Sequence, residues 1–135
     1  MSKPYTKKGA AMAAKNYKPV KLSGCSIDVN VFNDGKRHWK VTSLVSAARD
    51  LKPFDLPLSC INIGCRVWSD DMSIKQFASH VKRCNETDPK NPVIMDEDGF
   101  IMDGWHRVVR ALVEGKPTIK AVRFDSTPTC DYVVD

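Results

Sequence analysis

The fold expected for this chain is decided by residues 92–115, which read PVIMDEDGFIMDGWHRVVRALVEG. Apolar residues stand on both sides of Asp96-Glu97-Asp98-Gly99, and that polar run is a tight-turn sequence. Residues 92–95 and 100–102 are therefore expected to form a two-stranded hairpin. The hairpin leads directly into the next element.

A helix is expected to follow over residues 105–114. Val108, Val109 and Leu112 recur at the spacing that puts side chains on one face of a helix. Gly115 stands where a left-handed residue commonly closes a helix. A hairpin that runs straight into a helix is thus the centre of the predicted fold.

Further elements are expected on both sides of this centre. Before it, residues 56–63 read as a strand, and Ser73 with Gln76 forms a capping box for a helix. After it, residues 118–124 read as a last strand, and residues 125–135 as a loose or edge segment. The expected inward face of the capped helix consists of four apolar residues, Ile74, Phe77, Ala78 and Val81.

The N-terminal part of the chain adds a second hairpin and helix. A strand at 26–32, the turn at 33–36 and a return strand at 38–41 are expected, followed by a helix over 43–51 that Thr42 caps. This pattern predicts an α/β protein of the α+β kind, a small mixed sheet with helices. Its domain organisation is expected to be a basic, flexible arm at 1–22 and one domain at 23–135, which the 26–51 hairpin and helix extend.

Composition bounds the class of protein. A length of 135 residues suits one domain, and apolar and charged fractions of 42% and 27% are ordinary for a soluble protein. No apolar run approaches the roughly 18 residues of a membrane helix, and no apolar leader follows the first lysines. We therefore expect a cytoplasmic protein with no membrane partner. Its five cysteines, which lack CxxC spacing, are expected to be free thiols.

Positive charge is concentrated at one end of the chain. Residues 1–27 hold six of the 21 basic residues and none of the 16 acidic ones. Such an arm suits a polyanion, DNA or RNA, because each neutralised phosphate releases counterions. A solubilising leader is the alternative. The candidate nucleic-acid-binding residues are Lys3, Lys7, Lys8, Lys15, Lys18 and Lys21.

Chemistry is expected where the 92–102 hairpin meets its helix. Gly104 permits a sharp turn, and the first N–H groups of the following helix lack partners and favour an anion. His106 and Arg107 lie in that first turn, where cations oppose the helix dipole unless an anion binds between them. Arg107 can hold a phosphate through two hydrogen bonds, and His106 can donate a proton. The alternative is structural: Arg107 pairs with Asp96 or Asp98, and His106 is solvated.

Asp98-Gly99, Asp103-Gly104 and His106-Arg107 stand in this order before an apolar helix that ends at Gly115. The order resembles the signature of the ParB/sulfiredoxin superfamily, over about residues 56–124, half of the chain. The resemblance implies a compact fold with a phosphate or nucleotide pocket at the helix start. It implies CTP or ATP with Mg²⁺ as ligand. The pocket residues that it implies are Gly104, Trp105, His106, Arg107 and, from the preceding loop, Arg66.

Departures from the family pattern narrow the implied function. Sulfiredoxins carry a cysteine where this chain has Trp105, so sulfinic acid reduction is not expected. Chromosome-partition proteins carry a Gly-Glu-Arg-Arg motif and two further domains, for which about eleven residues after the last strand leave no room. Free-serine kinases have a motif similar to residues 103–107. They also place a catalytic carboxylate before the second helix, where Asp70 and Asp71 stand here.

Two metal sites are conceivable from the residue types. Asp103, with Asp96 and Asp98, offers carboxylates for a divalent ion, although an ordinary hairpin turn also accounts for the latter two. A zinc site lacks the spacings of the common zinc modules, and a cysteine in the 56–63 strand is more simply a core residue. Its ligands would be Cys60, Cys65, His80 and Cys84.

Two functions remain open on the sequence. The first is a ParB-like protein of phage or plasmid type that binds a nucleotide or nucleic acid. Nuclease, NTPase or kinase-type phosphoryl chemistry would then involve His106, Asp103 and Asp71, and Trp105 would stack on a base or pack in the core. The second is a non-catalytic interaction or inhibitor protein, a scaffold whose lysine arm binds a protein or nucleic acid. Whether any turnover occurs is left open.

Overall fold

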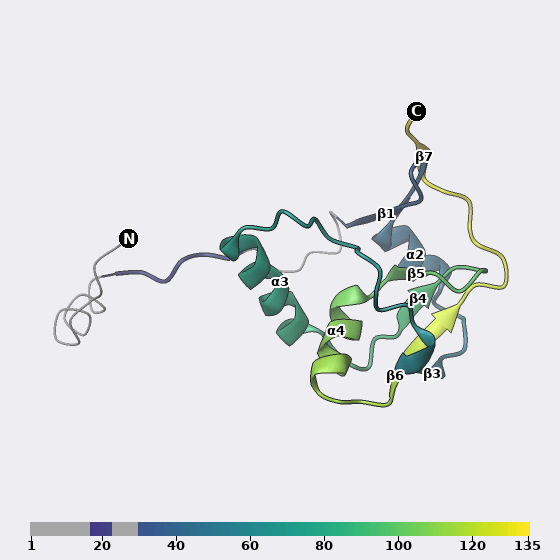
Figure 1. Ribbon diagram of the computed structural model, residues 1–135. Coiled ribbons are helices and arrows are strands. Elements are labelled where there is room, and N and C mark those ends of the chain that lie inside the picture. The colour runs from purple at the N-terminus through teal and green to yellow at the C-terminus, as the bar shows by residue number, and fades with distance from the viewer. Residues whose placement is uncertain (1–16, 23–29) are drawn as a thin grey trace.

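The structure, a computed structural model, describes residues 17–22 and 30–135. Within these residues the chain forms an α+β fold with two small sheets (Figure 1), which confirms the predicted fold class. Sheet A has the strand order β1-β2-β7, and sheet B has the order β3-β6-β4-β5. The elements are β1 (Val31–Asn33), β2 (Arg37–Lys40), α2 (Val41–Ala47), β3 (Phe54–Pro57), η2 (Leu58–Cys60), α3 (Ile74–Glu86), β4 (Val93–Met95), β5 (Ile101–Asp103), α4 (Trp105–Val113), β6 (Thr118–Arg123) and β7 (Tyr132–Val133).

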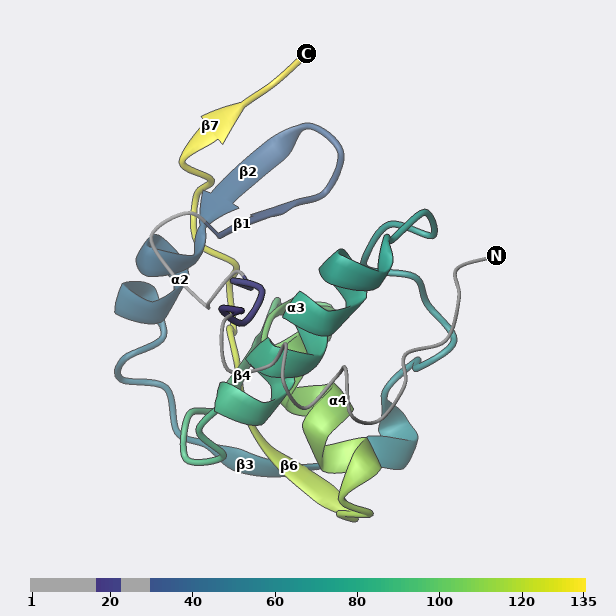
Figure 2. The same ribbon diagram turned by 90° about the vertical axis from the view of Figure 1, so that its left-hand side faces the viewer.

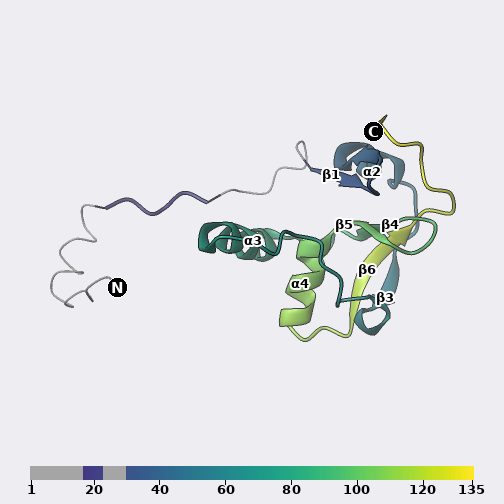
Figure 3. The same ribbon diagram turned by 45° about the horizontal axis from the view of Figure 1, so that its top comes forward.

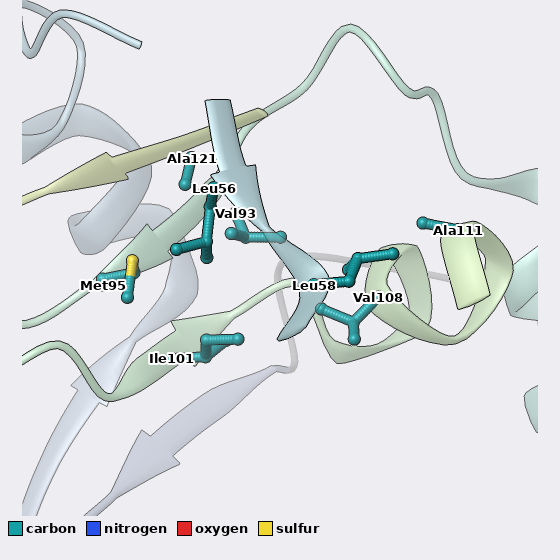
Figure 4. Close-up of a cluster of buried hydrophobic side chains, with 8 residues drawn as sticks. All are labelled: Leu56, Leu58, Val93, Met95, Ile101, Val108, Ala111 and Ala121. Carbon is teal, nitrogen blue, oxygen red and sulfur yellow. The ribbon is translucent and has the colours of Figure 1, made fainter. Parts of the chain in front are cut away.

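Sheet B is the centre of the fold because both of its faces are buried. β4 runs parallel to β6 and antiparallel to β5, and β3 pairs antiparallel with the other side of β6. All three residues of β4 are buried, as expected for a strand that is covered on both faces. One face is covered by α4 (Figure 4). The cluster between them consists of Leu56, Leu58, Val93, Met95, Ile101, Val108, Ala111 and Ala121.

The other face of sheet B is covered by β2 and α2. Trp39 from β2 and Leu44 from α2 belong to a second buried cluster with residues of β4, β5 and β6. The N-terminal hairpin and helix therefore complete the core. The predicted turn at 33–36 is confirmed, since β1 and β2 pair antiparallel across it.

The C-terminal segment joins this N-terminal part of the fold. β7 adds an edge strand to β2. The carboxylate of Asp131 accepts hydrogen bonds from the Lys40 N–H at 2.7 Å and the Ser43 hydroxyl at 2.9 Å. The Trp39 indole donates to the carbonyl of Pro128 at 2.8 Å. Of the two interpretations of residues 125–135, the edge segment is confirmed.

Three predicted boundaries are wrong or only partly described. The helix predicted at 43–51 is α2, and Thr42 lies inside it instead of capping it; the Asp131 carboxylate holds the N–H at its N-cap instead. The strand predicted at 56–63 ends at Pro57, where the chain turns into η2. As a result, Cys60 is exposed, and its interpretation as a core residue is wrong. Most of the strand predicted at 26–32 lies outside the described residues.

The helix α3 keeps its predicted start but not its predicted orientation. The capping box is confirmed: the Ser73 hydroxyl accepts from the Gln76 N–H at 3.1 Å, and the Gln76 side chain accepts from the Ser73 N–H at 2.8 Å. However, Ile74 is 86% exposed and Phe77 57% exposed. The buried residues of α3 are Ser79 and Cys84. The prediction that the apolar face points inward is therefore wrong.

The layers explain where this apolar face lies. α3 packs on α4, and α4 packs on sheet B, so α3 is the outermost layer on that side (Figures 1 and 2). The tilted view in Figure 3 shows the same order, with α4 between α3 and sheet B. Within the described ranges, no helix combines the length and apolar character needed to cross a lipid bilayer.

Candidate functional site

The start of α4 is fixed by a glycine. Gly104 has φ +116°, a left-handed conformation that side chains disfavour. A Cβ at Gly104 would lie 2.5 Å from Cγ1 of Val93 and 2.8 Å from a guanidinium nitrogen of Arg107. The space beside Gly104 is therefore filled by these two side chains. The first turn of α4 rests directly on β4, and its leading N–H groups lack acceptors within the helix.

A pair of histidines joins α3 to this first turn. Nδ1 of His80, from the middle of α3, lies 2.8 Å from Nε2 of His106, the second residue of α4. At this distance one ring donates a hydrogen bond and the other accepts it. The two rings are inclined by only 16°. They form a unit of two nearly parallel rings, called the histidine pair below.

Trp68 covers the histidine pair. Its ring centroid lies 4.4 Å from that of His80 and 4.6 Å from that of His106, with both planes inclined by 28° to the indole. These are stacking distances. Trp68 comes from the loop between η2 and α3, and so three separate segments of the chain meet at one point.

The surroundings of the histidine pair are electropositive. Burial lowers the pKa of His106 to about 4, and the positive charges of Arg83 and Arg107, together with His80, add to this effect. Burial and the charge of Arg83 also lower the pKa of His80. Both histidines are consequently neutral near pH 7. The same positive field that disfavours their protonation favours a bound anion.

Arg83 supplies a cation with an unused donor. It lies one turn after His80 on the inward side of α3, and its Nε is shielded from solvent without a hydrogen-bond partner among the described residues. Such a buried donor without an acceptor costs about 1–3 kcal/mol. An acceptor from a ligand would relieve that cost.

These groups line one open cavity of about 540 Å³, called the basic cavity below. Its walls come from β1, the start of α2, the loop before α3, α3 itself, β5 and the start of α4. The volume lies within the range of roughly 300–1,000 Å³ that is typical of small-molecule sites. The cavity is therefore larger than a lone phosphate requires. Its ionisable or aromatic wall residues are Phe32, Trp68, His80, Arg83, Asp103, Trp105 and His106, of which Asp103 is paired with Arg107.

The structure brings together four of the residues predicted from the sequence. Asp103, Gly104, Trp105 and His106 all line the basic cavity. Trp105 is also partly buried against the cluster between sheet B and α4. Both interpretations of this tryptophan, as core residue and as cavity wall, are therefore compatible with its position.

Three other predicted residues lie elsewhere. The Arg107 guanidinium is turned away from the basic cavity: it donates to the carbonyl of Pro92 at 3.0 Å and to Asp103 at 3.2 Å. Arg107 is thus ion-paired, as the structural alternative expected. Its partner is Asp103, however, and not Asp96 or Asp98. Arg66 is exposed and pairs with Asp70 at 3.1 Å, beside a neighbouring cavity. Asp71 is exposed and is not among the residues that line the basic cavity.

The predicted metal ligands do not come together. Within the described part of the chain, no group of three or more His, Cys, Asp or Glu side chains could hold an ion. Asp96 serves the hairpin turn, where its carboxylate accepts from two backbone N–H groups. Cys65 is exposed like Cys60, and burial raises the pKa of the Cys84 thiol, which disfavours the thiolate that zinc binds.

The lysine arm is only partly described. Lys18 and Lys21 are exposed. The remaining candidates, Lys3, Lys7, Lys8 and Lys15, lie outside the described residues. The nucleic-acid-binding role of the arm stays a prediction.

Sequence reasoning missed Trp68 and Arg83 as site residues, and it considered His80 only as a zinc ligand. A signal was present, because His80 and Arg83 are three residues apart on the polar side of a helix whose start was correctly placed. The prediction that the apolar side of α3 faces inward placed both of these residues in solvent. For Trp68, a loop residue, we find no local pattern that would have indicated its stacking.

No family model, curated protein or solved structure matches this chain. The resemblance to the ParB/sulfiredoxin superfamily therefore stays a prediction.

Proposed function

We propose that the protein binds a phosphate-bearing ligand, a nucleotide or the phosphate backbone of a nucleic acid, in the basic cavity. The observation that carries the proposal is Arg83, whose shielded Nε lacks a partner beside the histidine pair. The N–H groups at the start of α4 add donors on another wall. Phe32 and Trp105 offer ring faces for a base or sugar.

The histidine pair would make ligand binding depend on pH, because His106 can take up a proton when a phosphate binds. A phosphate placed beside His106 opposes the field that lowers its pKa, so binding favours uptake of a proton. Binding should therefore be tighter at pH 6 than at pH 8. His106 then donates to the phosphate in its charged form, which gives a stronger hydrogen bond.

Arg83→Gln tests this function better than a change of Arg107. Arg107 braces Asp103 and Pro92, so its removal would confuse lost binding with lost stability. The measurement is a thermal-shift screen of CTP, ATP, GTP and a short DNA, with and without Mg²⁺. A ligand at a hundred times its Kd stabilises the folded state by about 2.7 kcal/mol. The expected result is a shift that Arg83→Gln abolishes.

The matched control is Lys75→Gln, which removes one positive charge from the exposed side of the same helix. It should retain the shift. Equal loss in both variants would mean that net charge alone attracts the ligand. If only DNA binds, and deletion of residues 2–21 abolishes binding while Arg83→Gln does not, the lysine arm is the binding element and the cavity proposal fails.

A further inference from the structure

The outer surface of α3 and α4 carries an apolar strip that nothing in the described chain covers. It consists of Ile74, Phe77 and Val81 from α3 with Leu112 and Val113 from α4, called the outer strip below. These five side chains are between 39% and 86% exposed. Scattered exposed apolar residues are ordinary, but Phe77, Val81 and Val113 come from two neighbouring helices and line one groove, and such a gathering marks an interaction surface.

The outer strip also contains a groove. An open cavity of about 450 Å³ lies between α3 and α4, with Val81, Cys84 and Val109 among its apolar walls. Val113, 82% exposed, projects from its wall, and Ile74, 86% exposed, lies one helical turn before the wall residue Phe77. One surface therefore offers both projecting side chains and a recess. A two-fold symmetric contact needs both on the same patch, because each copy presents the same surface to the other.

The charges beside the outer strip fit a second copy better than a charged partner. Lys82 pairs with Glu86 on α3 at 3.7 Å, and Arg110 pairs with Glu114 on α4 at 3.0 Å. Both signs thus occur on each helix. Across a two-fold axis, a cation of one copy can face an acid of the other. A nucleic acid or a strongly acidic peptide would meet two carboxylates here.

The lysine arm is a poor occupant of the same groove. Its described part, residues 17–22, leaves Tyr17 74% exposed and Val20 75% exposed, so these apolar side chains are not seated on the fold. The arm also carries only positive charge. The arginine and lysine beside the outer strip would repel it as much as the two glutamates would attract it.

We infer that two copies of this chain associate through the outer strip, with the groove between α3 and α4 receiving the projecting side chains of the partner copy. This inference does not depend on the proposed ligand. It accounts for the orientation of α3, which directs its polar side to the basic cavity and its apolar side outward. Trp68 and His80 line both the groove and the basic cavity, so the interface and the candidate site adjoin.

Sedimentation velocity of the full chain across roughly 1–100 µM tests the inference. The expected result is a concentration-dependent dimer. Phe77→Glu and Ile74→Glu, each placing a charge in the strip at a side chain that is more than half exposed, should shift the chain to monomer at every concentration. Their thermal unfolding at a concentration where the wild type is also monomeric should be unchanged, which separates lost association from lost folding.

Phe100→Glu is the matched control, because Phe100 is 68% exposed on the 96–100 turn, away from the strip. It should dimerise like the wild type, as should a chain that lacks residues 2–16. A wild-type chain that stays monomeric throughout this range overturns the inference. A dimer that survives both strip variants, or that disappears with the arm, overturns it as well.

Discussion

The neighbouring helices α3 and α4 are both amphipathic, yet they use their apolar sides in opposite ways. α4 buries Val108 and Ala111 against sheet B, whereas α3 exposes Ile74 and Phe77 and turns His80 and Arg83 inward. The difference follows from position in the layers, since α4 packs on the sheet whereas α3 packs mainly on α4. A periodic pattern identifies which side of a helix is apolar. It does not identify what that side will face.

The largest expected effect concerns the start of α4, compared with its end. Gly104→Ala should destabilise the protein by about 3 kcal/mol or more, because the new Cβ would collide with Val93 in a left-handed conformation. Gly115→Ala at the other end of α4, where the new Cβ would meet no atom beyond its chain neighbours within 4 Å, should cost only about 1 kcal/mol. Urea unfolding of both variants measures the difference. Equal costs would show that backbone strain alone, without the contact to Val93, sets the start of α4.

A smaller effect compares the two apolar sides directly. Val108→Ala in α4 should cost about 2 kcal/mol, since Val108 is 1% exposed. Val81→Ala in α3, where the side chain is 43% exposed, should cost less than about 0.5 kcal/mol in the monomer. Chemical unfolding at a concentration that keeps the wild type monomeric gives both values. Similar values would contradict the outward orientation of α3.

The point where the two helices touch predicts a dependence of stability on pH. His106 has a pKa of about 4 when folded and an ordinary value near 6.5 when unfolded. The unfolded chain therefore binds more protons between these values. Stability should be full above pH 6.5 and fall as the pH drops toward 4, by on the order of 2 kcal/mol. Unfolding midpoints across this range measure the loss, and His106→Gln should flatten the profile. A profile that is equally steep in the variant would assign the loss to other groups.

The smallest expected effect concerns the start of α3. Ser73→Ala removes the hydroxyl that accepts from the Gln76 N–H and should cost about 1 kcal/mol. Thermal unfolding measures the cost. Ser69→Ala is the control: its hydroxyl also accepts a backbone N–H, from Asp71, but outside a helix, and it should change the midpoint little. A larger effect at Ser69 would mean that the loop, and not the cap, positions α3.

Features encoded by neighbouring residues could be predicted from the sequence. The turn at 96–99, the start of α4 at Gly104 and its end at Gly115 depend on local backbone conformation, and all three are as predicted. At that end, the N–H groups of Gly115 and Lys116 bond to the carbonyls of Leu112 and Ala111. The capping box of α3 is local in the same sense.

Features that depend on distant residues could not be predicted. Thr42 has the chemistry of a cap, but Asp131, nearly ninety positions along the chain, holds the start of α2. Arg107 was correctly placed at the start of α4, yet its guanidinium donates to the carbonyl of Pro92, fifteen positions earlier, instead of facing the cavity. Arg83 enters the candidate site only because of how α3 packs. In each case the outcome is set by tertiary contacts that compete with the local preference.

The pairing of β7 with β2 has a consequence for biosynthesis. The tail contacts of Trp39 and Lys40 span 89 and 91 positions of the sequence. At a synthesis rate of about 5–20 residues per second, the ribosome adds the tail roughly 5–20 s after β2, the strand with which β7 pairs. During that interval β2 has an unpaired edge, which can associate with other strands. A nascent chain of this protein would therefore benefit most from chaperone protection on its earliest hairpin, until residue 133 has been made.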